Sequence, residues 1–153
     1  MKHHKKIVVV ASGYFDPIHS GHINYLREAK KLGDKLIVIV NNDEQAKLKK
    51  EHYFMPVKER KAIIEAIKYV DEVFVSIDDD RSVKKSLMKI KPDIFAVGAD
   101  NYKHKLAEKE ICDKLGIKII DRLAKSLIKQ SSSKIIEKYL KKRRCNNGER
   151  NKW

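Results

Sequence analysis

Cysteine and long hydrophobic runs are both scarce in this sequence of 153 residues. Its two cysteines, Cys112 and Cys145, are too few for a disulfide framework, so we expect free thiols in a reducing compartment. The first apolar run, residues 7–11, is shorter than the core of a signal peptide. No run approaches the roughly 20 apolar residues of a membrane span. Together these features predict a soluble protein of the cytoplasm.

Two common phosphate-binding signatures are also missing. No G-x-G-x-x-G follows the first apolar run, and no G-x-x-x-x-G-K-[ST] occurs, so neither the dinucleotide fingerprint nor a P-loop is present. What the sequence has in excess is positive charge, with 35 Lys+Arg against 21 Asp+Glu and a net charge of +14. Such a surplus favours anionic partners, among them nucleotides, phosphorylated metabolites, nucleic acid and acidic lipid.

Short apolar runs alternate with helical patterns along the chain. The predicted strands are residues 6–11, 36–40, 72–75, 94–97 and 117–120. The predicted helices are residues 22–32, 57–69, 82–90, 105–115 and a last one from Ser131, and residues 43–56 are read as a lysine-rich connection. This alternation predicts an α/β fold, a Rossmann-like five-stranded parallel sheet with helices on both faces. We expect one domain over residues 1–143 and a basic, disordered tail over 144–153.

Ligands bind beyond the carboxyl ends of the strands in such a sheet, which directs attention to residues 12–22. There His19, Gly21 and His22 stand between the first strand and the first helix. A helix N-terminus favours an anion, glycine permits close approach, and two imidazoles three residues apart can donate to phosphate oxygens. Taken alone, the pair also fits a structural histidine pair or half of a zinc site. No other Cys/His cluster in the sequence completes a set of zinc ligands.

Three further strand ends carry polar residues of interest. They are Lys47 and Lys49 after the second strand, Gly98 and Asp100 after the fourth, and Ser131, Ser132 and Ser133 before the last helix. Each has an ordinary alternative, namely a solvated face, a turn and a plain helix cap. Their joint occurrence at one predicted edge of the sheet favours a phosphate-binding role.

The stretch Gly13-Tyr-Phe-Asp-Pro-Ile-His-Ser-Gly-His22 resembles the (T/S)-F-D-x-x-H-x-G-H signature of the cytidylyltransferase-like nucleotidyltransferase superfamily. Glycerol-3-phosphate cytidylyltransferase and heptose-phosphate adenylyltransferase belong to that superfamily. The resemblance extends over about residues 6–140. Lys47-Leu-Lys49 resembles its lysine pair, Val57-Lys-Glu-Arg60 its arginine-bearing helix start, and Pro92–Asp100 its P-D-x-x-x-x-G-x-D segment. Gln130–Ile135 is similar to its I-S-(S/T)-(S/T)-x-I helix cap.

The resemblance implies the HxGH nucleotidyltransferase fold and assigns roles to individual residues. His19, His22, Lys47, Lys49 and Arg60 become the expected catalytic residues, and no protein-bound metal is implied. The expected nucleotide-binding residues are Gly13, Tyr14, Phe15, Asp16, Gly21, Gly98, Asp100, Ser131, Ser132 and Ser133.

The implied reaction is transfer of AMP or CMP from ATP or CTP to a small sugar-, polyol- or alcohol-phosphate, with release of pyrophosphate. Mg²⁺ accompanies the nucleotide, and the superfamily suggests a homodimer. The serine cap and the Asp16-Pro17 pair are similar to adenylyl-transferring branches and favour ATP. Two alternatives stay open, a basic nucleic-acid-binding protein and a non-catalytic nucleotide sensor on the same fold. Residues 134–153 hold eight Lys/Arg and two Glu, which also permits contact with nucleic acid or anionic membrane.

Overall fold

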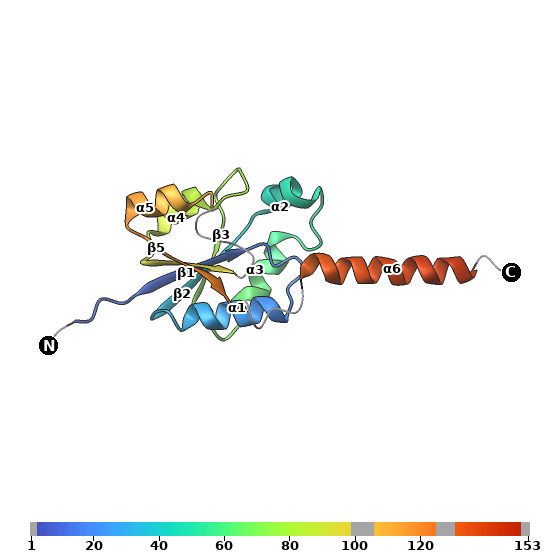
Figure 1. Cartoon of the computed structure of the whole chain (residues 1–153), viewed down its shortest axis with the longest axis horizontal. Coiled ribbons are helices and arrows are strands. Elements are labelled where there is room, and N and C mark those ends of the chain that lie inside the picture. The colour runs from blue at the N-terminus through green and yellow to red at the C-terminus, as the bar shows by residue number, and fades with distance from the viewer. Residues whose placement is uncertain (1–2, 99–105, 125–130, 151–153) are drawn as a thin grey trace.

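A computed structural model describes residues 3–98, 106–124 and 131–150, with the backbone alone for 145–150. Strands and helices alternate along the chain (Figure 1). The elements are β1 (Val8–Gly13), α1 (Ser20–Lys30), β2 (Lys35–Val40), α2 (Asp43–Lys50), α3 (Val57–Glu65), β3 (Glu72–Val75), α4 (Lys84–Ile90), β4 (Ile94–Gly98), α5 (Lys109–Leu115), β5 (Lys118–Leu123) and α6 (Ser132–Arg150).

The five strands form one parallel sheet in the order β3-β2-β1-β4-β5, which confirms the predicted fold class. Strands β1 and β2 pair in register from Val8 with Lys35 to Gly13 with Val40. The strand order reverses direction between β1 and β4, and ligands of open α/β sheets bind at such a switch point. The carboxyl ends of these two strands therefore mark the place for a site.

Two hydrophobic clusters hold helices on opposite faces of the sheet. Leu26 of α1 and Ile64 of α3 pack with Val9 and Val38 on one face. Leu87 of α4 and Cys112 of α5 pack with residues on the other face. Because both faces are covered, the strands are nearly continuous apolar runs, and this pattern made them predictable. Figure 1 shows α1 and α3 on one side of the sheet and α4 and α5 on the other.

The segment 43–56 differs from its prediction, because its first half is the helix α2. The Asn42 side chain accepts a hydrogen bond from the Gln45 amide, and the Gln45 side chain accepts one from the Asn42 amide. This reciprocal arrangement is a capping box, which satisfies two backbone donors at a helix start. The lysine-rich composition concealed the helix, since only Gln45 and Ala46 of α2 are buried.

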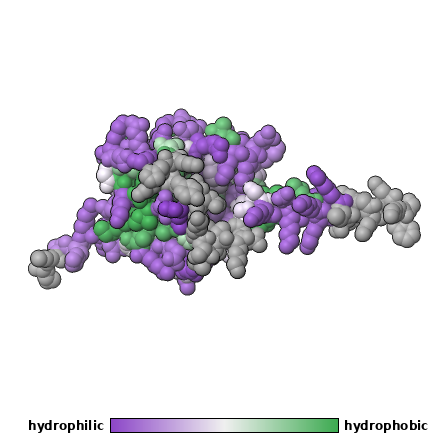
Figure 2. Space-filling model, in the orientation of Figure 1, coloured by the Kyte–Doolittle hydropathy of each residue, from purple (hydrophilic) through white to green (hydrophobic). Residues whose placement is uncertain are grey.

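Helix α6 also continues further than predicted, through Arg150 rather than fraying beyond Lys141. It projects from the body of the molecule (Figure 1). Figure 2 shows that hydrophilic residues dominate the visible face, with a hydrophobic area at the level of the sheet. Within the described ranges, no helix is long and apolar enough to cross a membrane. The division at residue 143 stays a prediction.

Candidate active site

A cleft of about 1140 Å³ opens at the carboxyl ends of β1 and β4. Tyr25, buried in α1, lies at the junction of these strands, where its hydroxyl accepts a hydrogen bond from the Ser12 amide and donates one to the Ala96 carbonyl. The cleft is lined by Ser12, Gly13, Tyr14, Phe15, His19, Gly21, His22, Tyr25, Asn41, Leu48, Lys49, Lys50, Asp79, Asp80, Arg81, Ser82, Val83, Phe95, Val97, Leu106, Ala107, Glu108, Ser131, Ser132 and Ser133.

His19 and His22 lie together in the cleft and act as the cap of α1. His19 Nδ1 accepts a hydrogen bond from the Gly21 amide at 3.0 Å, and His22 Nδ1 accepts one from the His19 amide at 3.1 Å. Each Nδ1 is therefore the unprotonated nitrogen, and each neutral ring carries its proton on Nε2. The rings stack with centroids 3.8 Å apart, and the Phe15 ring meets His22 edge-on. The backbone thus prepares two Nε2–H donors for an anion.

Both histidines are held in the neutral state. Burial lowers the pKa of His22 from 6.5 to about 3, and the nearby charges of His19, Lys50 and Lys49 contribute in the same direction. Burial also lowers the pKa of His19. At neutral pH the two rings are therefore uncharged hydrogen-bond donors, and the positive charge at the cleft comes from neighbouring lysine and arginine side chains.

This low pKa predicts a loss of stability in mild acid. The unfolded chain protonates His22 near pH 6.5, whereas the folded protein resists protonation until about pH 3, so stability falls as the pH drops through this window. By pH 5 the His22 contribution to the free energy of unfolding is lower by about 2 kcal/mol. Urea denaturation of the wild type and of His22→Gln, each at pH 7 and pH 5, measures this contribution. The other titrating groups are the same in both proteins, so their effects cancel when the two pH dependences are compared. An identical pH dependence in both proteins would contradict the prediction.

The chain turns tightly over residues 13–16, between the end of β1 and the two histidines, and Phe15 and Asp16 are buried there. Phe15 adopts φ of +52° and is almost wholly buried, and a side chain on Gly13 would stand only 3.0 Å from the Phe15 ring. Asp16 is 1% exposed, and its carboxylate accepts hydrogen bonds from the Phe54 and Met55 amides. The Asp16 carboxylate therefore holds the chain between α2 and α3, and its contact with nucleotide stays a prediction.

Tyr14 lines the cleft, and its hydroxyl is buried with no hydrogen-bond partner satisfying normal geometry in the described parts of the chain. Burial raises the pKa of Tyr14, while the nearby Arg81 guanidinium acts to lower it. The Lys49 ammonium lies over the Tyr14 ring, 4.3 Å from its centroid, in a cation–π contact. The Tyr14 ring therefore supports the Lys49 ammonium at the cleft wall.

Lys47 and Lys49, the two predicted catalytic lysines, point in different directions because they are two residues apart on helix α2. Lys49 faces the cleft, where burial and then the charges of Lys50 and Arg81 lower its pKa. Lys47 does not line the cleft, and instead forms an exposed ion pair with Glu44 at 3.0 Å. The predicted catalytic role of Lys47 does not fit this placement. Lys50, which the prediction omitted, lines the cleft and donates to the Asp16 carbonyl.

Arg60 is placed differently from its prediction. It is 1% exposed, and its guanidinium donates to the Met55, Tyr14 and Asn41 carbonyls and to the Asp43 carboxylate. Four of the five guanidinium donors are thereby used inside the protein. Arg60 is not a lining residue of the cleft, and its internal partners favour a positioning role, so the contact with phosphate stays a prediction. It holds together the loops after β1 and β2.

The serines at the start of α6, Ser131–Ser133, also line the cleft. Ser131 Oγ accepts a hydrogen bond from the Lys134 amide, and Ser132 Oγ donates to the Pro17 carbonyl at 2.7 Å. A second helix start thus lies beside the His19–His22 loop, as predicted. Gly98 ends β4, and Asp100 lies outside the described residues.

Arg81 is a second lining cation, besides Lys50, that sequence reasoning missed. It follows the acidic run Asp78-Asp79-Asp80 after β3, a strand end that is expected to form part of the site. Three consecutive aspartates are typical of a turn or a helix start, and such a run does not by itself indicate an anion site. The useful signal was the position of a cation within the loop that follows β3, at the carboxyl edge of the sheet.

Comparisons with known proteins agree with this geometry. The cytidylyltransferase-like family matches residues 10–138. The chain is 41% identical to an FAD synthase of Ferroglobus placidus over 133 residues, covering 85% of this chain and 86% of the relative. It is 38% identical to an FAD synthase of Archaeoglobus fulgidus over 140 residues, covering 87% of this chain and 97% of the relative. The crystal structure of a lipopolysaccharide core biosynthesis protein from Thermoplasma volcanium matches with a TM-score of 0.67 and 34% identity, over 77% of this chain and 97% of that one.

A parallel sheet with an H-x-G-H helix start at its switch point defines a nucleotidyltransferase. This chain belongs to the cytidylyltransferase-like family.

Proposed function

We propose that this enzyme transfers the adenylyl group of ATP to FMN, forming FAD and pyrophosphate. The support is the match to FAD synthases over most of both chains, together with the H-x-G-H site at the sheet edge. FAD consists of AMP joined to FMN, so a nucleotidyltransferase that makes it requires ATP as donor and FMN as acceptor. FMN carries its phosphate on a ribityl chain and is thus a polyol phosphate, although a flavin is far larger than the small acceptor predicted from the sequence.

The chemistry is an in-line displacement. An oxygen of the FMN phosphate forms a bond to the α-phosphorus of ATP, and the bond to the bridging oxygen of pyrophosphate breaks. The attacking phosphate is already ionised at neutral pH, so no strong base is needed. Catalysis then depends on orientation and on stabilising negative charge.

Different residues of the cleft orient the substrates and stabilise the negative charge. The Nε2–H groups of His19 and His22 donate to the α-phosphoryl oxygens as charge develops there. The starts of α1 and α6, at Gly21 and Ser131–Ser133, hold the β- and γ-phosphates through backbone amides and hydroxyls. The loop of Gly13, Tyr14 and Phe15 supports the nucleotide from below, and Lys49 and Lys50 offset its charge.

For the nucleoside we propose the residues predicted from the sequence, Gly98 and Asp100, as contacts of the base and ribose. Mg²⁺ is proposed to enter with ATP, where it neutralises charge on the phosphates. Among the residues that the structure describes, no group of three or more His, Cys, Asp or Glu side chains is placed to hold a metal ion. The homodimer also stays a prediction, which light scattering tests.

The deciding experiment incubates the enzyme with Mg²⁺, ATP and FMN and follows FAD by chromatography and pyrophosphate by a coupled assay. We expect equal amounts of both products. Riboflavin in place of FMN is expected to give little product, because it lacks the attacking phosphate. We also expect little product when CTP replaces ATP or when glycerol 3-phosphate replaces FMN. Turnover with CTP or glycerol 3-phosphate but not with ATP and FMN would overturn the proposal. Absence of pyrophosphate with every pair would favour the nucleotide sensor.

A further inference from the structure

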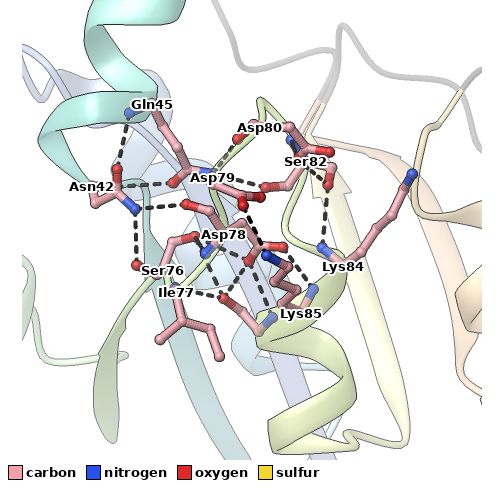
Figure 3. Close-up of polar contacts among 11 residues, drawn as sticks. Asn42, Gln45, Ser76, Ile77, Asp78, Asp79, Asp80, Ser82, Lys84 and Lys85 are labelled. Carbon is pink, nitrogen blue, oxygen red and sulfur yellow. Dashed lines mark hydrogen bonds and ion pairs between the residues drawn. The ribbon is translucent and has the colours of Figure 1, made fainter.

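Two amide side chains of the capping box also attach α2 to the loop between β3 and α4 (Figure 3). Asn42 Nδ2 donates to the Ser76 and Asp78 carbonyls at 3.0 and 2.9 Å. Gln45 Nε2 donates to the Asp80 and Ser82 carbonyls at 2.7 and 2.8 Å. Helix α2 and the loop of residues 76–82 are therefore held together as one unit.

Gln45 binds the carbonyls on either side of Arg81. Its side chain is fully buried, so the two hydrogen bonds are shielded from water and costly to leave unmade. The carboxylate of Asp78 secures the other end of the loop by accepting from the Lys85 and Ser86 amides of α4. The position of Arg81 relative to α2 is thus defined by buried contacts, although Arg81 itself is exposed in the cleft.

Arg81, Lys49 and Lys50 face the same cleft without an acidic partner. No ion pair joins any of the three to a carboxylate in the described parts of the chain, although most other cations of the loops and helices near them are paired. Like charges gathered on one wall repel each other until an anion binds between them.

We propose that Arg81 binds the phosphate of the acceptor, with Gln45 as the positioning residue that holds it. This inference rests on the proposed function. In-line displacement places the attacking phosphate and the leaving pyrophosphate on opposite sides of the α-phosphorus. In the proposed site the helix starts of α1 and α6 hold the pyrophosphate. Helix α2 lies on the other side of the sheet from α1 (Figure 1). Arg81 lines the cleft from the loop that Gln45 binds to α2.

The guanidinium suits this task better than an ammonium would. Its planar donors match two phosphate oxygens at once, which gives orientation as well as charge. A phosphate held in this way presents its third oxygen toward the α-phosphorus, between the arginine and the histidine pair. The site would thus distinguish FMN from riboflavin through the phosphate alone.

The test measures steady-state kinetics of Arg81→Gln and Arg81→Lys with FMN and ATP varied separately. We expect KM for FMN to rise about 10- to 100-fold in Arg81→Gln, since a hydrogen bond to a charged group contributes about 1.5–3 kcal/mol. Arg81→Lys recovers only part of the affinity, and KM for ATP changes little in either variant. Lys89→Gln, which removes an exposed charge of α4 outside the cleft, is the matched control and is expected to behave as the wild type.

Gln45→Glu tests the positioning role. The substituted carboxylate still accepts from the Asn42 amide but loses both donors to the loop, so α2 keeps its cap while Arg81 loses its support. We expect KM for FMN to rise in this variant, and the effect to disappear when Arg81→Gln is already present. Additive effects of the two substitutions would show that Gln45 does not act through Arg81.

The outcomes separate the two proposals. An active wild type whose Arg81→Gln variant keeps its KM for FMN, or changes KM for ATP instead, overturns the Arg81 assignment and leaves the proposed function intact. A folded wild type that makes no FAD overturns the proposed function, and the assignment to FMN with it. A circular dichroism melt of each variant shows whether a change in KM reflects unfolding.

Discussion

Replacing His22 with Gln is expected to lower kcat about 10²–10³-fold while leaving the fold intact, as is typical for loss of one preorganised donor to a transition-state charge. Gln is chosen because its amide oxygen can accept from the His19 amide, as Gln does in the N3 position of a capping box. The substitution thus retains the helix cap and removes the Nε2–H donor. Initial rates of FAD formation at saturating ATP and FMN measure the effect.

A matched control separates catalysis from stability. His52→Gln makes the same chemical change at an exposed histidine that does not line the cleft, and we expect its kcat to equal that of the wild type. Thermal melts at pH 7 show whether His22→Gln is folded at the assay temperature. A folded His22→Gln enzyme with near-normal turnover would remove the histidine pair from the mechanism.

Replacing Arg60 with Met is expected to lower the free energy of unfolding by about 3–5 kcal/mol, the usual cost of removing one partner of a buried ion pair. The substitution leaves the Tyr14 and Asn41 carbonyls without their guanidinium donors and Asp43 without its cation. Urea denaturation followed by circular dichroism measures the loss. We expect Arg60→Lys to recover only a minority of it, because one ammonium cannot reach all four acceptors.

Lys58→Met, on an exposed position of the same helix, is the control and is expected to change stability by less than about 0.5 kcal/mol. The experiment also decides between the two roles considered for Arg60. A variant that keeps its stability but loses activity would restore the direct phosphate contact predicted from the sequence. A destabilised variant whose folded fraction retains activity supports the positioning role described above.

The sheet and the location of the site were predictable because both depend on local patterns. Five apolar runs separated by helical periodicity specify a doubly covered parallel sheet, and the H-x-G-H segment after the first run marks its edge. Helix α2 escaped prediction because its capping box, Asn42 and Gln45, stands in a lysine-rich stretch with little apolar periodicity. Its start signal was present, but the hydrophobic stripe that normally accompanies a helix was not.

Some roles within the site could be predicted from residue type, and others depend on whether the side chain is buried in the folded protein. The sequence by itself determined the family, and it located the two helix starts and the two histidines at the edge of the sheet, since these follow from motif and chain order. Only the tertiary structure showed that Arg60 and Asp16 satisfy their charges inside the protein, whereas Lys49, Lys50 and Arg81 are left facing the cleft. The physical reason is that a charged side chain acts on a ligand only when the fold supplies it no partner, and partners come from segments far apart in sequence.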